Sequence, residues 1–136
     1  MAKKEKNVSE ILSEFCELMD RVPKEYDSNY DEVHTLDYLT QDYLHKLELE
    51  DLDYQERAKI ATQLSKVRKR RRACKNMVSV LEPLSEFLSG PKGRDLSNMC
   101  HQILGETRKI ESQMADRMYF PRVLNEPAIH VNAKEV

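Results

Sequence analysis

The fold is decided by residues 53 to 89, DYQERAKIATQLSKVRKRRRACKNMVSVLEPLSEFLS. Apolar side chains recur through this stretch in alternating steps of four and three residues, which is the spacing of a heptad seam along one face of a long helix. Arg71 and Ser85 interrupt a seam that is otherwise made of Ile60, Leu64, Val67, Cys74, Val78, Leu81 and Leu88. The spacing predicts one helix over 53–89, and Asp53 with Glu56 has the pattern of a capping box at its start.

Outside this stretch, apolar residues at helical spacing predict three further helices, over about 9–22, 31–50 and 95–119. Ser9 is expected to cap the first helix, and Pro23 with the polar residues after it is expected to end it. The glycine- and proline-containing turn SGPKGR precedes the last helix. We therefore predict an all-α fold of four helices, in which helices 53–89 and 95–119 form an antiparallel, coiled-coil-like hairpin.

Taken together, these patterns predict a single helical domain over residues 1–120. Residues 121–136 have two prolines and no helical period, and they predict a flexible C-terminal tail. Three cysteines fall at apolar positions and are expected to be buried thiols in a reducing compartment: Cys16, Cys74 and Cys100. No run of about 18 apolar residues occurs, and no apolar segment follows the basic N-terminus. We expect a cytoplasmic protein with no membrane span.

The net charge of −2 conceals an uneven distribution along the chain. Residues 1–52 carry 14 acidic and 6 basic side chains, whereas residues 53–75 carry 2 acidic and 9 basic ones. Residues 76–136 are nearly neutral, with 8 acidic and 7 basic side chains. An acidic front and a short basic band are the places where a charged partner would be sought.

No pattern of catalytic residues is present in the sequence. His34 and His45 lack the spacing of metal ligands, and the neighbours Cys100 and His101 point to different sides of a helix. We find no phosphate-binding glycine loop and no nucleophile paired with a base, so we expect no enzyme, no metal, no cofactor and no small-molecule substrate. Gly105, in the middle of the last predicted helix, is expected to mark close helix packing.

The basic band is the one cluster of residues whose chemistry suggests a binding surface, and it lies in KVRKRRRACK, residues 66–75. One hypothesis is that it binds nucleic acid, or a nucleic-acid-handling host protein, through Lys66, Arg68, Lys69, Arg70, Arg72 and Lys75. The alternative is that the acidic front neutralises the band, with Asp37 and Asp31 beside Arg68 and Arg72. Both alternatives remain open at the level of sequence.

Arg71 occupies a seam position where leucine would be ordinary. If the SGPKGR turn joins the two arms of the hairpin, Glu111 falls opposite Arg71, and we predict a structural ion pair between them. The seam of helix 53–89 has a second possible role as the interface of a homo-oligomer.

The stretch LTQDYLHKLELEDLDYQERAKIATQLSKVRKRRRACK, followed later by RMYFPRV, resembles small helical proteins of phages and prophages of low-GC Gram-positive bacteria. The resemblance covers roughly residues 36 to 123 and includes no catalytic signature. It implies a host bacterial cytoplasm and a role in nucleic-acid metabolism, regulation or inhibition of a host defence enzyme. The hypothesis is a non-enzymatic phage-type protein, with two alternatives: an inhibitor of a host nuclease, similar to anti-CRISPR proteins, or a homo-oligomeric helical scaffold.

Overall fold

The structure is a computed structural model that describes residues 4–131, and the helices within this range are α1 (Val8–Leu49), α2 (Tyr54–Ser89) and α3 (Pro91–Ala115). They take up 42, 36 and 25 residues, which confirms a mostly helical chain. Two short antiparallel strands follow, β1 (Met118–Tyr119) and β2 (Ile129–His130). The prediction of four helices is wrong, since the described part of the chain has three.

The difference lies in α1, which continues through the segment that was predicted to be a linker. Pro23 lies inside this helix. A proline in a helix interior removes one backbone hydrogen bond, but the seam of partly buried residues runs on without a break at Tyr26, Asn29 and Val33. Burial along this seam offsets the lost bond, so the helix persists. Its first turn is capped by Asn7, whose side chain accepts a hydrogen bond from the Glu10 amide at 2.9 Å, rather than by Ser9.

The contacts divide the chain into two compact units, and α1 contributes to both. Unit 1 comprises Met1–Leu18 and Arg94–Val136, and unit 2 comprises Met19–Gly93. The predicted division into a domain over 1–120 and a flexible tail over 121–136 stays a prediction, and residues 132–136 lie outside the described range.

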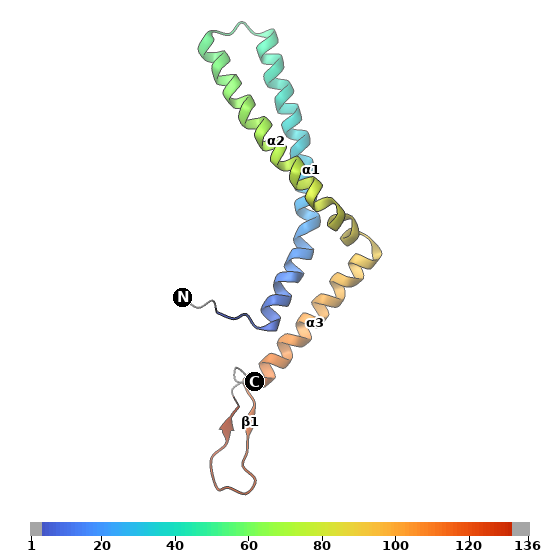
Figure 1. The fold of residues 1–136 in the computed structure, drawn as a ribbon, viewed down its shortest axis with the longest axis vertical. Helices are drawn as coiled ribbons and strands as arrows, with labels where there is room; N and C mark the ends of the chain where they lie inside the picture. Colours follow the sequence, from blue (N-terminus) through green and yellow to red (C-terminus); the bar gives the residue numbers. More distant parts are fainter. Residues whose placement is uncertain (1–3, 132–136) are drawn as a thin grey trace. The chain divides into compact units, whose positions relative to one another are not determined.

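In unit 2, α1 and α2 run side by side in opposite directions and are joined by a turn at residues 50–53 (Figure 1). The Asp53 side chain accepts a hydrogen bond from the Glu56 amide at 2.8 Å, which confirms the predicted cap of α2. Leu36 of α1 forms the core of the hairpin with Val67 and Cys74 of α2. The prediction had instead paired helix 53–89 with helix 95–119 in a hairpin.

The seam predicted for α2 is confirmed at every position. Within Tyr54–Ser89 the buried and partly buried residues are Ile60, Leu64, Val67, Arg71, Cys74, Val78, Leu81, Ser85 and Leu88, and all the others are exposed. Since this seam packs against α1, it is not available as the interface of a homo-oligomer.

In unit 1, the beginning of α1 pairs with α3, again in antiparallel fashion. The Ser9 amide donates a hydrogen bond to Glu111 at 3.2 Å, and the Arg108 guanidinium donates one to the Ser13 hydroxyl at 3.2 Å. Later residues of α1 thus meet earlier residues of α3.

The buried face of α3 is not the one that its large apolar side chains predict. Apart from Leu104, the buried and partly buried residues of its inner face are small or polar: Ser97, Cys100, Thr107 and Glu111. The apolar residues that guided the prediction are exposed on another face: Leu96, Met99, Ile103, Ile110 and Met114. Small side chains allow two helices to approach closely, and here they determine which face is buried.

The turn between α2 and α3 is shorter than the SGPKGR pattern predicts, because Gly90 alone separates the two helices. Pro91 occupies the first position of α3, where a missing amide proton costs nothing. Gly93 packs so tightly that an added Cβ would lie 2.1 Å from the Phe87 carbonyl oxygen. Gly105 has no neighbour within 4 Å of such a Cβ, so the prediction that it marks close packing is wrong.

The three cysteines are confirmed as buried thiols. Among residues 4–131, none of the helices is both long enough and apolar enough to cross a membrane.

Candidate nucleic-acid interface

The basic band lies on α2 within unit 2, and the structure divides it into two parts. Arg71 lies in the seam, Arg68 and Arg70 lie beside it, and all three form ion pairs with carboxylates of α1. Four other side chains of the band are exposed and form no ion pair within the described residues: Lys66, Lys69, Arg72 and Lys75. The acidic front therefore neutralises only the part of the band that borders α1.

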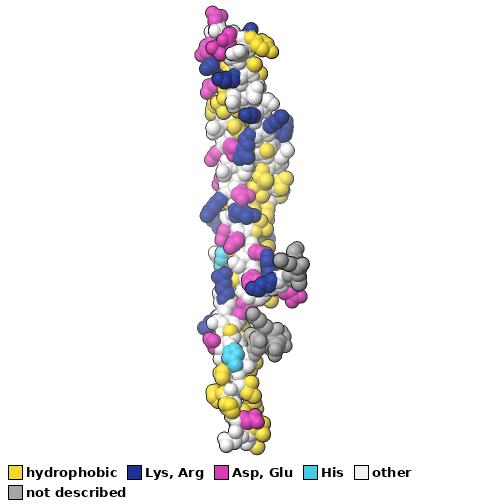
Figure 2. Space-filling model, turned by 90° about the vertical axis from the view of Figure 1, so that its left-hand side faces the viewer, with side chains coloured by type: hydrophobic (Ala, Val, Ile, Leu, Met, Phe, Trp, Pro, Cys, Tyr) yellow, Lys and Arg dark blue, Asp and Glu magenta, His cyan; other side chains and the backbone are white. Residues whose placement is uncertain are grey.

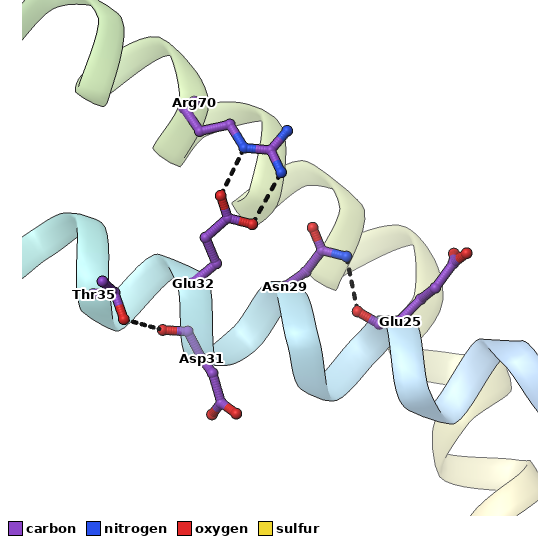
Figure 3. Close-up of polar contacts among 6 residues, drawn as sticks. All are labelled: Glu25, Asn29, Asp31, Glu32, Thr35 and Arg70. Carbon is purple, nitrogen blue, oxygen red and sulfur yellow. Dashed lines mark hydrogen bonds and ion pairs between the residues drawn. The ribbon is translucent and has the colours of Figure 1, made fainter.

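The Arg70 guanidinium binds the Glu32 carboxylate through two parallel hydrogen bonds of 2.7 and 2.9 Å (Figure 3). This arrangement fixes both planes and is stronger than a contact through one hydrogen bond. The contact with Arg70 holds the pKa of Glu32 below its usual range. Neighbouring side chains of α1 bond to their own helix, since Asn29 donates to the Glu25 carbonyl and Thr35 to the Asp31 carbonyl (Figure 3).

Asp37 is shared by two arginines of α2. It forms an ion pair with Arg71 through the guanidinium Nε, and Arg68 approaches the same carboxylate at 3.8 Å. The hydrogen bond from Arg71 lowers the pKa of Asp37, and the charge of Arg68 acts in the same direction. The expectation that Asp37 lies beside Arg68 is confirmed. No ion pair joins Asp31 to Arg72 in the described part of the chain.

The predicted ion pair between Arg71 and Glu111 is wrong, because Arg71 pairs with Asp37 and Glu111 accepts its hydrogen bond from the Ser9 amide. Only 17% of the Arg71 side chain is exposed, so this guanidinium needs a partner. The seam of α2 faces α1 within the hairpin, and α1 therefore supplies the carboxylate. Asp37 was missed as the partner of Arg71, although the turn at 50–53 would have placed it there.

Cys74 lies in the same part of the hairpin and is almost completely buried, with 1% of its surface exposed. Burial raises the pKa of its thiol, and the nearby Glu32 carboxylate raises it further. A thiol with a raised pKa is a poor nucleophile at neutral pH. Cys74 is therefore a packing residue of the hairpin rather than a reactive group.

The outward-facing part of the band has a simple geometry. Lys66, Lys69 and Arg72 recur every three residues on the side of α2 that faces away from the seam, and Lys75 lies at its flank. No acidic residue occurs in α2 between Glu56 and Glu82. Successive cations rise by about 4.5 Å along the helix axis and turn by about 60° around it, so they form a short oblique row that reaches the edge of the seam at Lys75. We call this row, Lys66, Lys69, Arg72 and Lys75, the outer basic row.

On the face drawn in Figure 2, Lys and Arg side chains are interleaved with Asp and Glu side chains along the hairpin in the upper half of the view. The surface of the hairpin thus carries charges of both signs. The residues the structure describes include no group of three or more histidine, cysteine or acidic side chains that could hold a metal ion. Within this range, the row's chemistry is that of fixed positive charge, suited to phosphates or carboxylates.

The ion pairs of the hairpin predict a stability that falls in acid. The folded-state pKa values of Glu32 and Asp37 lie below their ordinary values of 4.5 and 3.8. Their contribution is complete above these ordinary values and is lost as the pH falls through the lowered ones, since the unfolded chain then binds more protons. We expect the free energy of unfolding, measured with urea, to decrease as the pH falls below about 4.5.

The control is the double variant Glu32→Gln, Asp37→Asn, which keeps the shape of both side chains and cannot titrate at these positions. It should be less stable than the wild type at pH 7 and should lose less stability on acidification. An acid limb as steep as that of the wild type would show that other carboxylates dominate the pH dependence.

Comparison of the chain with protein-family models, with curated proteins and with solved structures gave no match.

Proposed function

We propose that this chain is a non-enzymatic, phage-type protein that binds nucleic acid through the outer basic row of α2. The observation that carries the proposal is the division of the basic band. Lys66, Lys69, Arg72 and Lys75 form no ion pair with any residue in 4–131, whereas the arginines next to them do. Charges that serve only to hold the hairpin together would face α1. The outer row faces solvent on a stretch of helix that has no carboxylate.

The row fits contact with the phosphate backbone rather than reading of bases. Phosphate contacts require charge and reach, and they tolerate variation in geometry. α2 has no aromatic residue between Tyr54 and Phe87, so it offers no platform on which single-stranded bases could stack. The proposed binding is therefore electrostatic and largely independent of sequence, and duplex nucleic acid is the first ligand to test.

The proposal predicts a steep dependence of affinity on salt. If the four cations of the row each neutralise one phosphate, the slope of log affinity against log salt is about −3.6. Raising the salt from about 50 to about 200 mM should then weaken duplex binding roughly 100-fold. An electrophoretic mobility assay or fluorescence anisotropy over a salt series measures the slope directly.

Variants that remove the positive charges of the row test whether it is the binding surface. Replacement of all four residues by glutamine (Lys66→Gln, Lys69→Gln, Arg72→Gln and Lys75→Gln) should abolish duplex binding at about 100 mM salt, whereas the single change Lys69→Gln should reduce the slope by about 0.9. A control with the same change of net charge has glutamine at Lys92, Lys109, Arg117 and Arg122 and should bind almost as the wild type does. Both variants should keep the helical circular dichroism spectrum.

Arg68 and Arg70 are expected to behave differently, although they were among the predicted binding residues. Because they pair with Asp37 and Glu32, their replacement by glutamine should lower the free energy of unfolding more than it alters the salt slope. This contrast separates binding charges from structural ones within one stretch of ten residues, 66–75.

Two outcomes would contradict the proposal. The first is no detectable binding of any duplex at about 50 mM salt, and the second is equal loss of binding in the control variant. If the row instead binds an acidic surface on a host nuclease, the wild type will retain that protein from a nuclease-treated lysate and the four-glutamine variant will lose it. That result would favour the inhibitor hypothesis over nucleic acid.

A further inference from the structure

Unit 1 has two rows of large apolar side chains that face solvent. On α1 the row comprises Val8, Ile11, Phe15 and Leu18, and on α3 it comprises Leu96, Met99, Ile103 and Ile110. Each of these residues has between 38% and 66% of its surface exposed. Their spacing of three, four and seven residues is that of a heptad seam, but the seam that actually packs within unit 1 is a different one.

Both rows have the same relation to the packed seam. On α1, Ile11 and Phe15 directly precede the inward-facing Leu12 and Cys16, and on α3, Ile103 directly precedes the buried Leu104. The residue that precedes an inward-facing one is rotated from it by about 100° around the helix axis, always in the same sense relative to the chain direction. In two antiparallel helices these rotations lead to the same side of the pair.

The register of the pair places the two rows across from each other. The contacts Ser9–Glu111 and Ser13–Arg108 put Ile11 level with Ile110. The same register puts Leu18 level with Ile103. The eight side chains therefore lie on one side of the two helices, with Glu106 between Ile103 and Ile110 and with Leu96 and Met99 beyond the level of Leu18. We call this side the unit 1 face.

We propose that the unit 1 face is the interface through which two copies of this chain assemble into a four-helix bundle. A pair of antiparallel helices with one apolar face is half of such a bundle, and a second copy offers an identical face. The proposal goes beyond the function proposed for α2, because the two surfaces belong to different units and can fail independently.

The extent of the face agrees with a stable dimer. A large apolar side chain has on the order of 200 Å² of surface, so eight of them at about half exposure present roughly 800 Å² per copy. One partner in a standard stable interface contributes about this area.

The charges at the edges of the face indicate how two copies would stack. Glu10, Glu14 and Glu17 follow one another along the outer edge of the α1 row. The corresponding edge of α3 carries Asp95, Asn98, Gln102 and Lys109, whose formal charges sum to zero. Stacking of α1 on the α1 of a second copy would bring two acidic edges together, which is unfavourable. In the proposed dimer, each α1 therefore lies over the α3 of the other copy.

The mass of the full chain in solution tests the proposal. Light scattering on a size-exclusion column, or sedimentation equilibrium, should give twice the mass of one chain at micromolar concentration. The variants Ile103→Glu and Phe15→Glu each place a charge in the face from a different helix, and each should raise the dissociation constant of the dimer by about 100-fold or more. Because both residues are exposed in the single chain, circular dichroism should show an unchanged helical content.

The matched control is Leu44→Glu, since Leu44 is 50% exposed, close to the 47% of Ile103, and lies on α1 within unit 2. This variant should remain a dimer. A wild-type chain with the mass of one copy would overturn the proposal, whether another protein or the chain's own C-terminal strands cover the face. Dissociation of the Leu44→Glu variant, or dimers that persist in both face variants, would overturn it as well.

Discussion

Replacing Gly93 with alanine should destabilise the protein by about 3 kcal/mol, although the change adds a single methyl group. The new Cβ would lie 2.1 Å from the Phe87 carbonyl oxygen and 2.5 Å from the Leu88 Cα. Both are backbone atoms near the end of α2, so no side chain can rotate away to make room. The turn must open, and overpacking of this kind costs on the order of 1–3 kcal/mol or more.

Gly105 provides the matched control for this substitution. It also lies in α3, but an added Cβ would meet nothing within 4 Å. Alanine in a helix interior is about 1 kcal/mol more favourable than glycine, so Gly105→Ala should stabilise the protein. Urea denaturation followed by circular dichroism should place the two variants on opposite sides of the wild type. If Gly93→Ala is neutral, the tight approach to Phe87 does not constrain the turn.

Truncating Leu36 to alanine should cost about 3 kcal/mol, within the range of roughly 2–5 kcal/mol for a buried leucine. Leu36 is buried between α1 and α2, where it contacts Val67 and Cys74, and Val33, Leu39 and Tyr43 pack around this cluster. The substitution removes part of a small core and leaves a cavity that the hairpin can close only by moving its helices.

Leu44→Ala is the control, because Leu44 lies on the same helix, two turns further on, and half of its surface is exposed. Surface substitutions of this kind change stability by about 0.5 kcal/mol. The free energies of unfolding, from urea titrations of both variants, should therefore differ by more than about 2 kcal/mol. Equal losses in the two variants would contradict the placement of the core at Leu36.

The sequence predicted α2 well and α3 only in part, and the cause is the size of the buried side chains. In α2 most seam residues are large and apolar, so hydrophobic spacing and burial coincide, and even Arg71 and Ser85 fall where the period places them. In α3 the inward positions are small or polar at Ser97 and Thr107. Hydrophobicity alone then points to the wrong face, because close helix approach favours small residues.

The candidate interface was predicted as a group of residues but not as two functional halves. Charge counts locate the band between residues 66 and 75, whereas the division between pairing and exposed cations depends on which helix packs against the seam. The turn near residue 52 was enough to predict Asp37 beside Arg68. The predicted hairpin of helices 53–89 and 95–119 assigned Arg71 to Glu111, so Asp37 was missed as its partner.

The sharing of α1 between the two units has a consequence for how the chain folds as it leaves the ribosome. The ion pairs within unit 2 join residues 31 to 38 positions apart, so this hairpin can close once α2 has left the ribosome. Pairs within unit 1 span 95 and 102 residues and must wait for the synthesis of α3. Contacts over such distances form slowly because of the entropy of loop closure. During that interval the first turns of α1 expose both of their apolar sides, which makes the nascent chain most vulnerable to aggregation before α3 has been synthesised.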